Sequence, residues 1–209
     1  MLLKIKEGQT VSDSSFDKLF PVEVRKAAEF HFTPVEVAKL AAQFLVSKEG
    51  IKVLDIGSGA GKFCLIGAAT TKGEFTGVEQ RPELCIIARH LAQQYELTNT
   101  NFINDNLTNI DFSTFDAFYI FNPFMEHRTP NDVLDVNIDI DRQLYTVYSN
   151  HVKEALAKMP TGTRLATYFS YGDEIPVNYV LVGGDEEMKL RFWQKNNFEL
   201  NEQGEMAAF

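Results

Sequence analysis

The sequence predicts an α/β protein built on a doubly wound, mostly parallel sheet of about seven strands. Patterns typical of buried strands and amphipathic helices alternate over residues 51–170, as expected for parallel strands joined by helical crossovers. Two further strand patterns, connected by Gly183-Gly184, predict a closing hairpin that makes the last strand antiparallel. Helical patterns precede this region. We therefore expect an N-terminal helical extension over residues 1–50 and a domain over residues 51–209, together forming one globular unit.

The N-terminal extension is predicted to begin loosely and to end in a well-defined helix. We expect residues 1–12 to be weakly held, as chain termini commonly are. The helical pattern that follows is divided by Pro21. In the stretch Phe-Thr-Pro-Val-Glu, Thr33 fits the N-cap, Pro34 the first helical position and Glu36 the third. This spacing predicts a capping box at the start of the next helix.

The region after residue 50 opens with a short apolar strand pattern, Lys52–Ile56, followed by three alternating glycines. A strand that ends in such a turn and opens a helix brings backbone N–H groups close to a ligand. Gly57, Gly59 and Gly61 therefore predict a binding turn. The later strands are expected at about residues 74–79, 101–105, 115–124 and 163–170, and the helices at about 62–71, 82–95 and 142–159.

Polar side chains follow several of these predicted strands. Glu79 ends the second strand, Asp105 the third, and Asn122 lies near the end of the fourth. In a doubly wound sheet the carboxyl ends of the strands share one edge, where ligands bind. An acid at the end of the second strand can accept hydrogen bonds from both hydroxyls of a ribose. The sequence therefore predicts a nucleoside site at this edge, with an ordinary strand–helix turn that binds no ligand as the alternative.

The glycine spacing helps to identify the nucleoside. A dinucleotide fingerprint starting at Gly57 needs a glycine at position 62, where this chain has Lys62. Asp55 lies two positions before the first glycine, where its charge would repel a pyrophosphate but suits a cationic amino group. These two residues disfavour a nicotinamide-dependent oxidoreductase, which is the less favoured alternative.

The stretch D-I-G-S-G-A-G resembles the first motif of the class I S-adenosylmethionine-dependent methyltransferases, with Glu79 matching their ribose-binding acid. The resemblance implies a Rossmann-like fold, S-adenosyl-L-methionine as cofactor and S-adenosyl-L-homocysteine as product. It also implies that Asp105 meets the exocyclic amine of adenine and that the following backbone N–H meets the ring. The cofactor-binding residues expected on this basis are Phe32, Thr33, Asp55, Gly57, Ser58, Gly59, Gly61, Glu79, Gln80, Asp105, Asn106 and Asn122.

The segment Phe32-Thr33-Pro34 looks like the element that precedes the glycine motif in several methyltransferases. The resemblance implies that the N–H groups at this helix start face the carboxylate of the cofactor. The alternative is that the segment merely starts a helix. Thr-Pro-Val, G-S-G-A-G-K-F-C, G-V-E-Q-R-P and F-N-P-F together resemble a group of small bacterial methyltransferases of unassigned substrate.

The segment Asn122-Pro123-Phe124 resembles the Asn-Pro-Pro-Tyr/Phe motif of amino-group methyltransferases, with one proline fewer. The glycine and glutamate motifs also resemble those of the non-SET histone-lysine methyltransferases. The resemblance implies direct methyl transfer to an amine, with Asn122, Pro123 and Phe124 as the catalytic residues. Two alternatives stay open at this point: Asn-Pro simply ends a strand, or the chain is a non-catalytic relative that binds S-adenosylmethionine or a partner protein.

The amino-acid composition indicates which kinds of partner the protein can bind. The chain has 20 Lys and Arg against 29 Asp and Glu, a net charge of -9, so an extended nucleic acid is a disfavoured partner. A small-molecule or protein methyl acceptor is expected instead. Cys64 and Cys85 fall in helical patterns and predict buried thiols without metal-site spacing. The absence of a signal-peptide pattern or an apolar run of membrane-spanning length predicts a cytoplasmic protein.

A polar, acidic connection, residues 125–141, follows the fourth strand at the ligand edge. It could attract a cationic substrate, or it could be a solvated surface loop. His127, near its start, is a candidate base.

Overall fold

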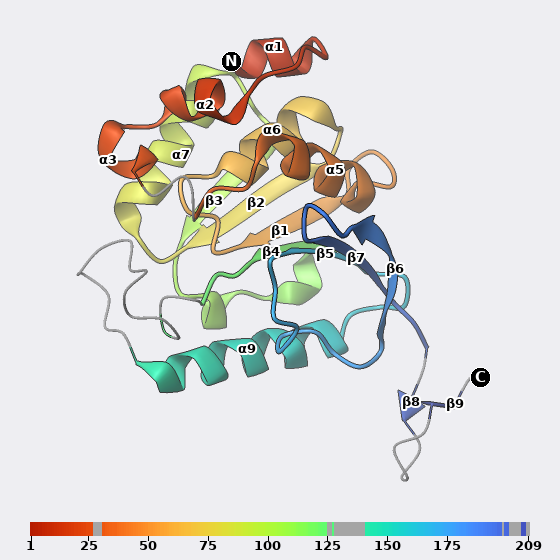
Figure 1. Ribbon diagram of the computed structural model, residues 1–209. Coiled ribbons are helices and arrows are strands. Elements are labelled where there is room, and N and C mark those ends of the chain that lie inside the picture. The colour runs from red at the N-terminus through yellow and green to blue at the C-terminus, as the bar shows by residue number, and fades with distance from the viewer. Residues whose placement is uncertain (27–30, 125–126, 128–140, 198, 201–205, 208–209) are drawn as a thin grey trace.

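A seven-stranded sheet forms the centre of the computed structural model (Figure 1). The structure describes residues 1–26, 31–124, 127, 141–197, 199–200 and 206–207. The strand order is β3-β2-β1-β4-β5-β7-β6. The strands are β1 (Lys52–Ile56), β2 (Glu74–Glu79), β3 (Thr100–Asn104), β4 (Ala117–Phe121), β5 (Arg164–Tyr168), β6 (Tyr179–Asp185) and β7 (Leu190–Lys195).

The sheet has the predicted direction pattern. The strands β3, β2, β1, β4 and β5 pair in parallel, and β7 pairs antiparallel with both β5 and β6. The order reverses between β1 and β4, and such a switch point opens a crevice at the carboxyl ends of the strands. The doubly wound, Rossmann-like class predicted from the alternating pattern is therefore confirmed.

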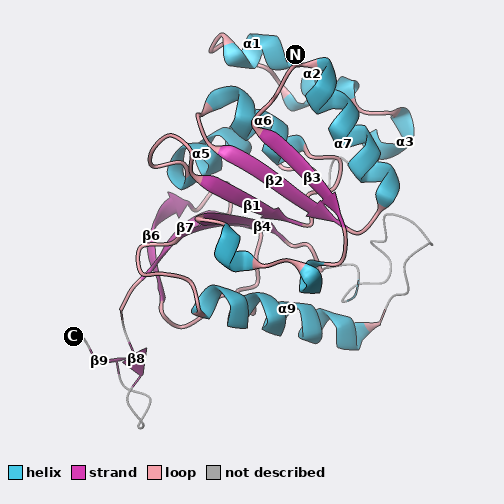
Figure 2. Cartoon of the chain, turned by 180° about the vertical axis from the view of Figure 1, so that it is seen from behind, coloured by secondary structure: helices cyan, strands magenta, loops and turns pink. Residues whose placement is uncertain are grey.

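Helices cover both faces of the sheet (Figure 2). One face is covered by α5, α6 and α7, with the N-terminal helices outside them, and the other by α9 (Figure 1). The helices are α1 (Leu2–Lys6), α2 (Asp13–Phe16), α3 (Val22–Arg25), α5 (Val35–Leu45), α6 (Lys62–Thr70), α7 (Pro82–Gln94) and α9 (Arg142–Ala157). Short 3-10 turns are η1 (Asp17–Leu19), η2 (Leu107–Asn109) and η3 (Phe112–Thr114).

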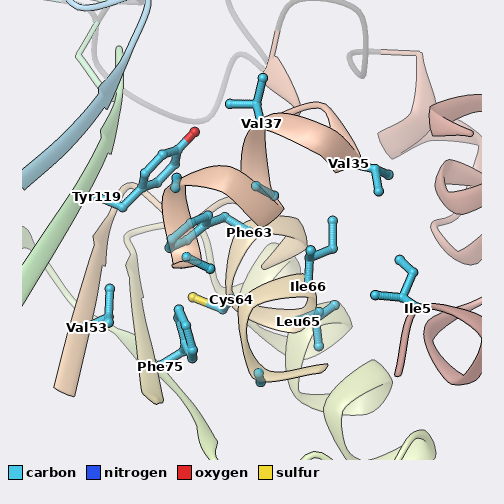
Figure 3. Close-up of a cluster of buried hydrophobic side chains, with 14 of the residues drawn as sticks. Ile5, Val35, Val37, Val53, Phe63, Cys64, Leu65, Ile66, Phe75 and Tyr119 are labelled. Atoms are coloured by element: carbon cyan, nitrogen blue, oxygen red, sulfur yellow. The ribbon is translucent and has the colours of Figure 1, made fainter. Parts of the chain in front are cut away.

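Each face of the sheet buries its own apolar core, because successive strand residues point to opposite faces. Val53 and Tyr119 belong to the cluster under α5 and α6, and Figure 3 shows the Tyr119 ring beside Phe63 of α6. Leu54 and Ile120 belong to the cluster under α9. The same alternation puts Asp55 on the α6 side of the sheet, which decides its environment.

The N-terminal extension packs more firmly than its sequence suggests. We expected residues 1–12 to be loosely held, but they contain α1, whose Leu2 and Ile5 are buried in the same cluster as α5 and α6. That expectation was wrong because apolar contacts hold this terminus. The predicted break at Pro21 is confirmed, since it separates η1 from α3. The domain boundary at residue 50 stays a prediction.

The closing hairpin forms, but its turn lies elsewhere. Gly183 and Gly184 lie inside β6, directly after Val182, where the register against β7 shifts by one residue, and the chain turns between Asp185 and Leu190. The Gly-Gly pair therefore marks a β-bulge rather than the predicted connector. A Cβ on Gly184 would lie 2.3 Å from the Leu190 carbonyl oxygen, so close backbone approach explains the glycine. The C-terminal segment adds a small ladder of β8 (Glu199–Leu200) and β9 (Met206–Ala207).

Candidate active site

The glycine turn lies between β1 and α6 at the switch point. Gly57, Gly59 and Gly61 have φ values of +74°, +53° and +82°, which favour glycine. A Cβ on Gly57 would lie 2.6 Å from the Pro123 Cβ, and one on Gly61 would lie 2.6 Å from the Phe102 ring. Beside Gly59, in contrast, no atom lies within 4 Å of the Cβ position. Gly57 and Gly61 are therefore needed for packing, whereas Gly59 faces open space.

Glu79 lies at the end of β2 and is held against the glycine turn. Its side chain is 6 % exposed. Its Oε2 accepts a hydrogen bond from the Gly59 N–H at 3.0 Å, and its Oε1 accepts one from the Arg81 N–H at 2.9 Å. The Arg81 guanidinium lies 3.8 Å from Oε1. These contacts fix the orientation of a buried carboxylate directly beside the open space at Gly59.

Asp55 is a buried carboxylate whose charge lacks compensation. It is 4 % exposed, and Cys64 Sγ donates a hydrogen bond to its Oδ2 at 3.4 Å. Burial raises the pKa of Asp55 from 3.8 to about 7, the Cys64 hydrogen bond lowers it in part, and the Glu79 charge raises it further. Among the described residues, no ion pair is formed by Asp55. A cationic group arriving beside it would favour its ionised form.

The start of α5 differs from the predicted capping box. The helix begins at Val35, with Pro34 in the N-cap position and no side-chain cap bond from that residue. The Thr33 hydroxyl instead forms a 2.9 Å hydrogen bond with the Tyr119 hydroxyl. The Val35 N–H donates to Asp13 Oδ1 at 2.8 Å. The local prediction was wrong because a carboxylate distant in sequence satisfies the helix end.

Lys62 occupies the position where a dinucleotide fingerprint has its third glycine. Its side chain is only 4 % exposed. The ammonium donates to Asp13 Oδ1 at 2.7 Å and to Asp17 Oδ1 at 2.6 Å, and it lies 5.7 Å from the centroid of the half-buried Phe32 ring. Lys62 therefore links α6 to the N-terminal segment. Phe32 also packs edge-on against Phe20, with the ring centroids 4.8 Å apart.

The remaining predicted cofactor residues lie around the ends of β2 and β3. Gln80 is exposed and follows Glu79 directly. Asp105, one residue after β3, is exposed and accepts hydrogen bonds from the Asn106 N–H and from Asn109 Nδ2. Asn106 donates to the Tyr148 hydroxyl at 2.9 Å. In the glycine turn, Ser58 Oγ is buried and has no hydrogen-bond partner in the described part of the chain.

The Asn-Pro-Phe segment follows β4 on the other side of the switch point. Asn122 has a φ of +36°, an uncommon backbone conformation that Asn adopts more readily than most residues. Pro123 packs against Gly57, so this segment touches the glycine turn. Phe124 is buried against Tyr148, with the ring centroids 5.4 Å apart. A strained backbone at a packed strand end is a feature often found at functional sites.

A small hollow, open to solvent, lies beside this segment. Its lining residues come from three parts of the chain: Asn122, Pro123, Phe124, Tyr145, Ser149 and Glu174. No pattern in the sequence indicated that Tyr145, Ser149 and Glu174 belong to the site. Ser149 resembles any other polar residue along α9, and Glu174 lies in a polar connection after β5, so neither stands out before the chain is folded.

The candidate base His127 lies at the start of the connection that follows β4. His127 is buried near Tyr148, with the ring centroids 5.7 Å apart. Most of the acidic connection, residues 125–126 and 128–140, lies outside the described residues.

Cys64 and Cys85 are buried free thiols, as predicted. The described residues contain neither a cluster that could hold a metal ion nor a helix of sufficient length and apolarity to span a membrane.

Comparison of the chain with solved structures gives the fold. TrmN from Thermus thermophilus matches with a TM-score of 0.59 at 17% identity, over 83% of this chain and 52% of TrmN. An RNA methyltransferase from Salinibacter ruber in complex with S-adenosyl-L-homocysteine matches with a TM-score of 0.56 at 19% identity, over 83% of this chain and 98% of that one. A mutant of MtNAS in complex with S-adenosylmethionine matches with a TM-score of 0.54 at 15% identity, over 92% of this chain and 70% of the MtNAS chain. The chain thus spans about half the length of TrmN.

The family follows from comparison with sequence families. No curated protein matches the chain. A family model described as a methyltransferase domain matches residues 47–174, a span that runs from before β1 to Glu174 and includes the glycine turn, Glu79 and Asn122. The chain belongs to this methyltransferase domain family.

Proposed function

We propose that this protein is an S-adenosylmethionine-dependent methyltransferase that transfers a methyl group by direct in-line displacement to an amine, in a small molecule or a protein. The observation that supports this best is the presence of two buried carboxylates next to the glycine turn: Asp55, near the end of β1, and Glu79, which accepts the Gly59 N–H beside open space. One such carboxylate can bind the cationic amino group of the cofactor and the other its ribose hydroxyls. Solved structures of similar fold that contain this cofactor or its product support the proposal.

The described residues fit the cofactor. Asp55 has a pKa raised to about 7 by burial, so a neighbouring ammonium group would stabilise its ionised form. Glu79, oriented by two backbone N–H groups, would hold the ribose hydroxyls. The buried Ser58 side chain packs against Gly77 of β2 and closes the floor of the turn. Phe32, Thr33, Gln80, Asp105 and Asn106 remain proposed contacts.

When bound, S-adenosylmethionine supplies a methyl carbon that is electrophilic because it is attached to a sulfonium. The protein's task is to hold a nucleophile in line with it. In our proposal the Asn122 side-chain oxygen accepts a hydrogen bond from the amine and orients the nitrogen lone pair. Pro123 lacks an N–H that would compete for the same acceptor atoms. Phe124 gives this side of the site an apolar wall.

Cofactor binding can be tested by thermal unfolding. S-Adenosyl-L-homocysteine at about 100 times its dissociation constant should stabilise the fold by about 2.7 kcal/mol, which raises the melting temperature by about 5–10 °C for a chain of this size. Glu79→Ala should lower the affinity at least about tenfold, because charge-assisted hydrogen bonds to the ribose are lost. Calorimetry gives the affinities, and NAD serves as the control ligand. Stabilisation by NAD alone would favour the nicotinamide-dependent oxidoreductase.

A separate measurement distinguishes an enzyme from a non-catalytic relative. Release of S-adenosyl-L-homocysteine from S-adenosylmethionine in the presence of an acceptor demonstrates transfer. Asn122→Ala should leave cofactor affinity nearly unchanged and lower turnover about 10²-fold, as expected when an orienting group is lost. Unchanged turnover in this variant would mean that Asn122 only ends β4.

A further inference from the structure

The hollow beside Asn122 contains two buried polar side chains that the glycine turn and the family motifs do not explain. They are Glu174, from the connection after β5, and Ser149, from α9. We infer that these two side chains bind the amino group of the methyl acceptor, so that the site selects acceptors with a primary or secondary amine. This inference rests on the proposed function and adds the recognition of the acceptor to it.

Glu174 is a carboxylate in an unusual environment. It is 5 % exposed, and the Ser170 hydroxyl donates a hydrogen bond to its Oε1 at 2.5 Å. No Lys or Arg within the described ranges forms an ion pair with it. Burying a carboxylate with so little compensation costs free energy, and a bound cation would recover it. A carboxylate that lines a hollow and lacks a cation in the protein is suited to an ammonium group from a ligand.

Ser149 provides the second, independent observation. It is 3 % exposed, lines the same hollow, and its Oγ has no hydrogen-bond partner among the described residues. Most buried hydroxyl groups in proteins are hydrogen-bonded. A hydroxyl can accept a hydrogen bond from an N–H group and can also donate one. An amine bound next to Glu174 would therefore satisfy Ser149 as well.

The other walls of the hollow favour the same class of ligand. Asn122 adds an amide oxygen as a third acceptor, and the rings of Phe124 and Tyr145 form an aromatic wall on which a cation can lie. The Tyr145 hydroxyl donates to Asp173 at 2.8 Å, which keeps a second carboxylate close to the hollow. Carboxylate or phosphate groups on an acceptor would be repelled here. The hollow thus combines hydrogen-bond acceptors with negative charge, which suits an ammonium group. The ammonium must lose one proton before its nitrogen lone pair can attack, and the Glu174 carboxylate in the same hollow can accept that proton.

The test uses the full-length protein saturated with S-adenosyl-L-homocysteine. The probes are spermidine, a lysine-containing peptide and a peptide with a free N-terminus, each paired with its N-acetylated form. We expect at least one amine, but not its acetylated form, to raise the melting temperature. The same amine should release S-adenosyl-L-homocysteine when S-adenosylmethionine is supplied. Glu174→Gln keeps the shape and the contact to Ser170, and it should raise the KM for that amine about tenfold or more, while the affinity for S-adenosyl-L-homocysteine stays within about twofold.

Two further variants complete the experiment. Ser149→Ala should raise the KM for the amine without lowering the melting temperature, because it removes a hydroxyl that has no partner. Glu187→Gln removes the same charge at an exposed position outside the hollow, and it should change neither the KM for the amine nor the melting temperature. A protein that binds S-adenosyl-L-homocysteine but responds to no amine probe, or a Glu174→Gln variant with wild-type KM, would overturn the inference. Failure to bind S-adenosyl-L-homocysteine would instead refute the proposed function.

Discussion

Gly59 is the residue at which the proposed binding turn can be tested most directly. Gly59 and Gly50 both have positive φ, +53° and +79°, and neither has an atom within 4 Å of its Cβ position. Substitution of either glycine by alanine should therefore strain the backbone and lower the free energy of unfolding by a similar amount, about 1–2 kcal/mol. Only the methyl group of Gly59→Ala would project beside Glu79 into the proposed cofactor site. We expect this variant to lose at least about tenfold in affinity for S-adenosyl-L-homocysteine by calorimetry, a difference of about 1.4 kcal/mol.

Gly50→Ala serves as the matched control, because Gly50 precedes β1 and so lies at the opposite end of that strand from the glycine turn. It should lose similar stability and keep wild-type affinity. Equal affinities in the two variants would mean that the cofactor does not approach Gly59.

Asp55 makes stability depend on pH. Its folded pKa of about 7 lies above the ordinary value of 3.8, so the folded state binds this proton more tightly than the unfolded chain does. The resulting stabilisation is complete below pH 3.8 and is lost as the pH rises to about 7. Asp55→Asn does not titrate and can still accept the Cys64 hydrogen bond. Its stability relative to wild type should therefore increase by about 2–3 kcal/mol between pH 5 and pH 8.

Urea denaturation of both proteins at the two pH values measures this change. The Asn variant should also bind S-adenosylmethionine more weakly at pH 8, because the cationic amino group loses its ionised partner. A difference in stability that is the same at pH 5 and pH 8 would contradict the raised pKa.

At the scale of single residues, the sequence could identify the groups fixed by local chain geometry. Glu79 was predictable because it is the last residue of β2. Gly57 was predictable because the turn that leads into α6 needs a residue with positive φ. Glu174 and Ser149 were not predictable. They come together only when the connection after β5 and α9 meet at the hollow, and no local spacing relates them.

At the scale of elements, Lys62 joins the N-terminal segment to the domain. Its buried ammonium pairs with Asp13 and Asp17, and Asp13 also receives the first N–H of α5. Lys62→Met keeps most of the apolar stem and leaves two carboxylates without their cation. Because Asp13 is half exposed, we expect a loss of about 2–3 kcal/mol in the free energy of unfolding, below the usual loss for breaking a fully buried pair.

Lys72→Met is the control for this prediction. Lys72 pairs with Glu49 at 2.9 Å, but both side chains are more than two thirds exposed. Such a surface pair contributes about 1 kcal/mol or less. Chemical denaturation of the two variants should therefore separate them clearly, and equal losses would show that the Lys62 contacts contribute no more than a surface pair.

The same contacts explain which elements could be predicted. The strand β4 is a continuous apolar run and β1 is largely apolar, so both were found, and β1 and β2 were found at their observed bounds. The start of α5 was predicted one residue early and with the wrong cap, because its cap comes from Asp13. The role of Gly183 and Gly184 was also misjudged, since a bulge and a turn have the same local glycine signal.

At the scale of the whole molecule, the alternating pattern was sufficient to predict the sheet and its direction. The order of strands and the way α1 shares a core with α5 and α6 depend on long-range packing. The fold does not determine the acceptor, because one fold supports many substrates. One of the structures of similar fold is an RNA methyltransferase, yet this chain has a net charge of -9.

Net charge makes a prediction about nucleic acid. Binding to an extended phosphate backbone requires several Lys or Arg side chains that release counterions. Here 29 acidic residues outnumber 20 basic ones, and Lys62 already pairs with two carboxylates in the protein. We therefore expect the affinity for unmodified tRNA at 150 mM salt to be weaker than about 10⁻⁴ M, the weak end of non-specific binding. Electrophoretic mobility shift and fluorescence anisotropy should detect no complex at micromolar protein. Tight binding that weakens steeply with added salt would refute this expectation and would make RNA, rather than an amine in a small molecule or a protein, the acceptor to pursue.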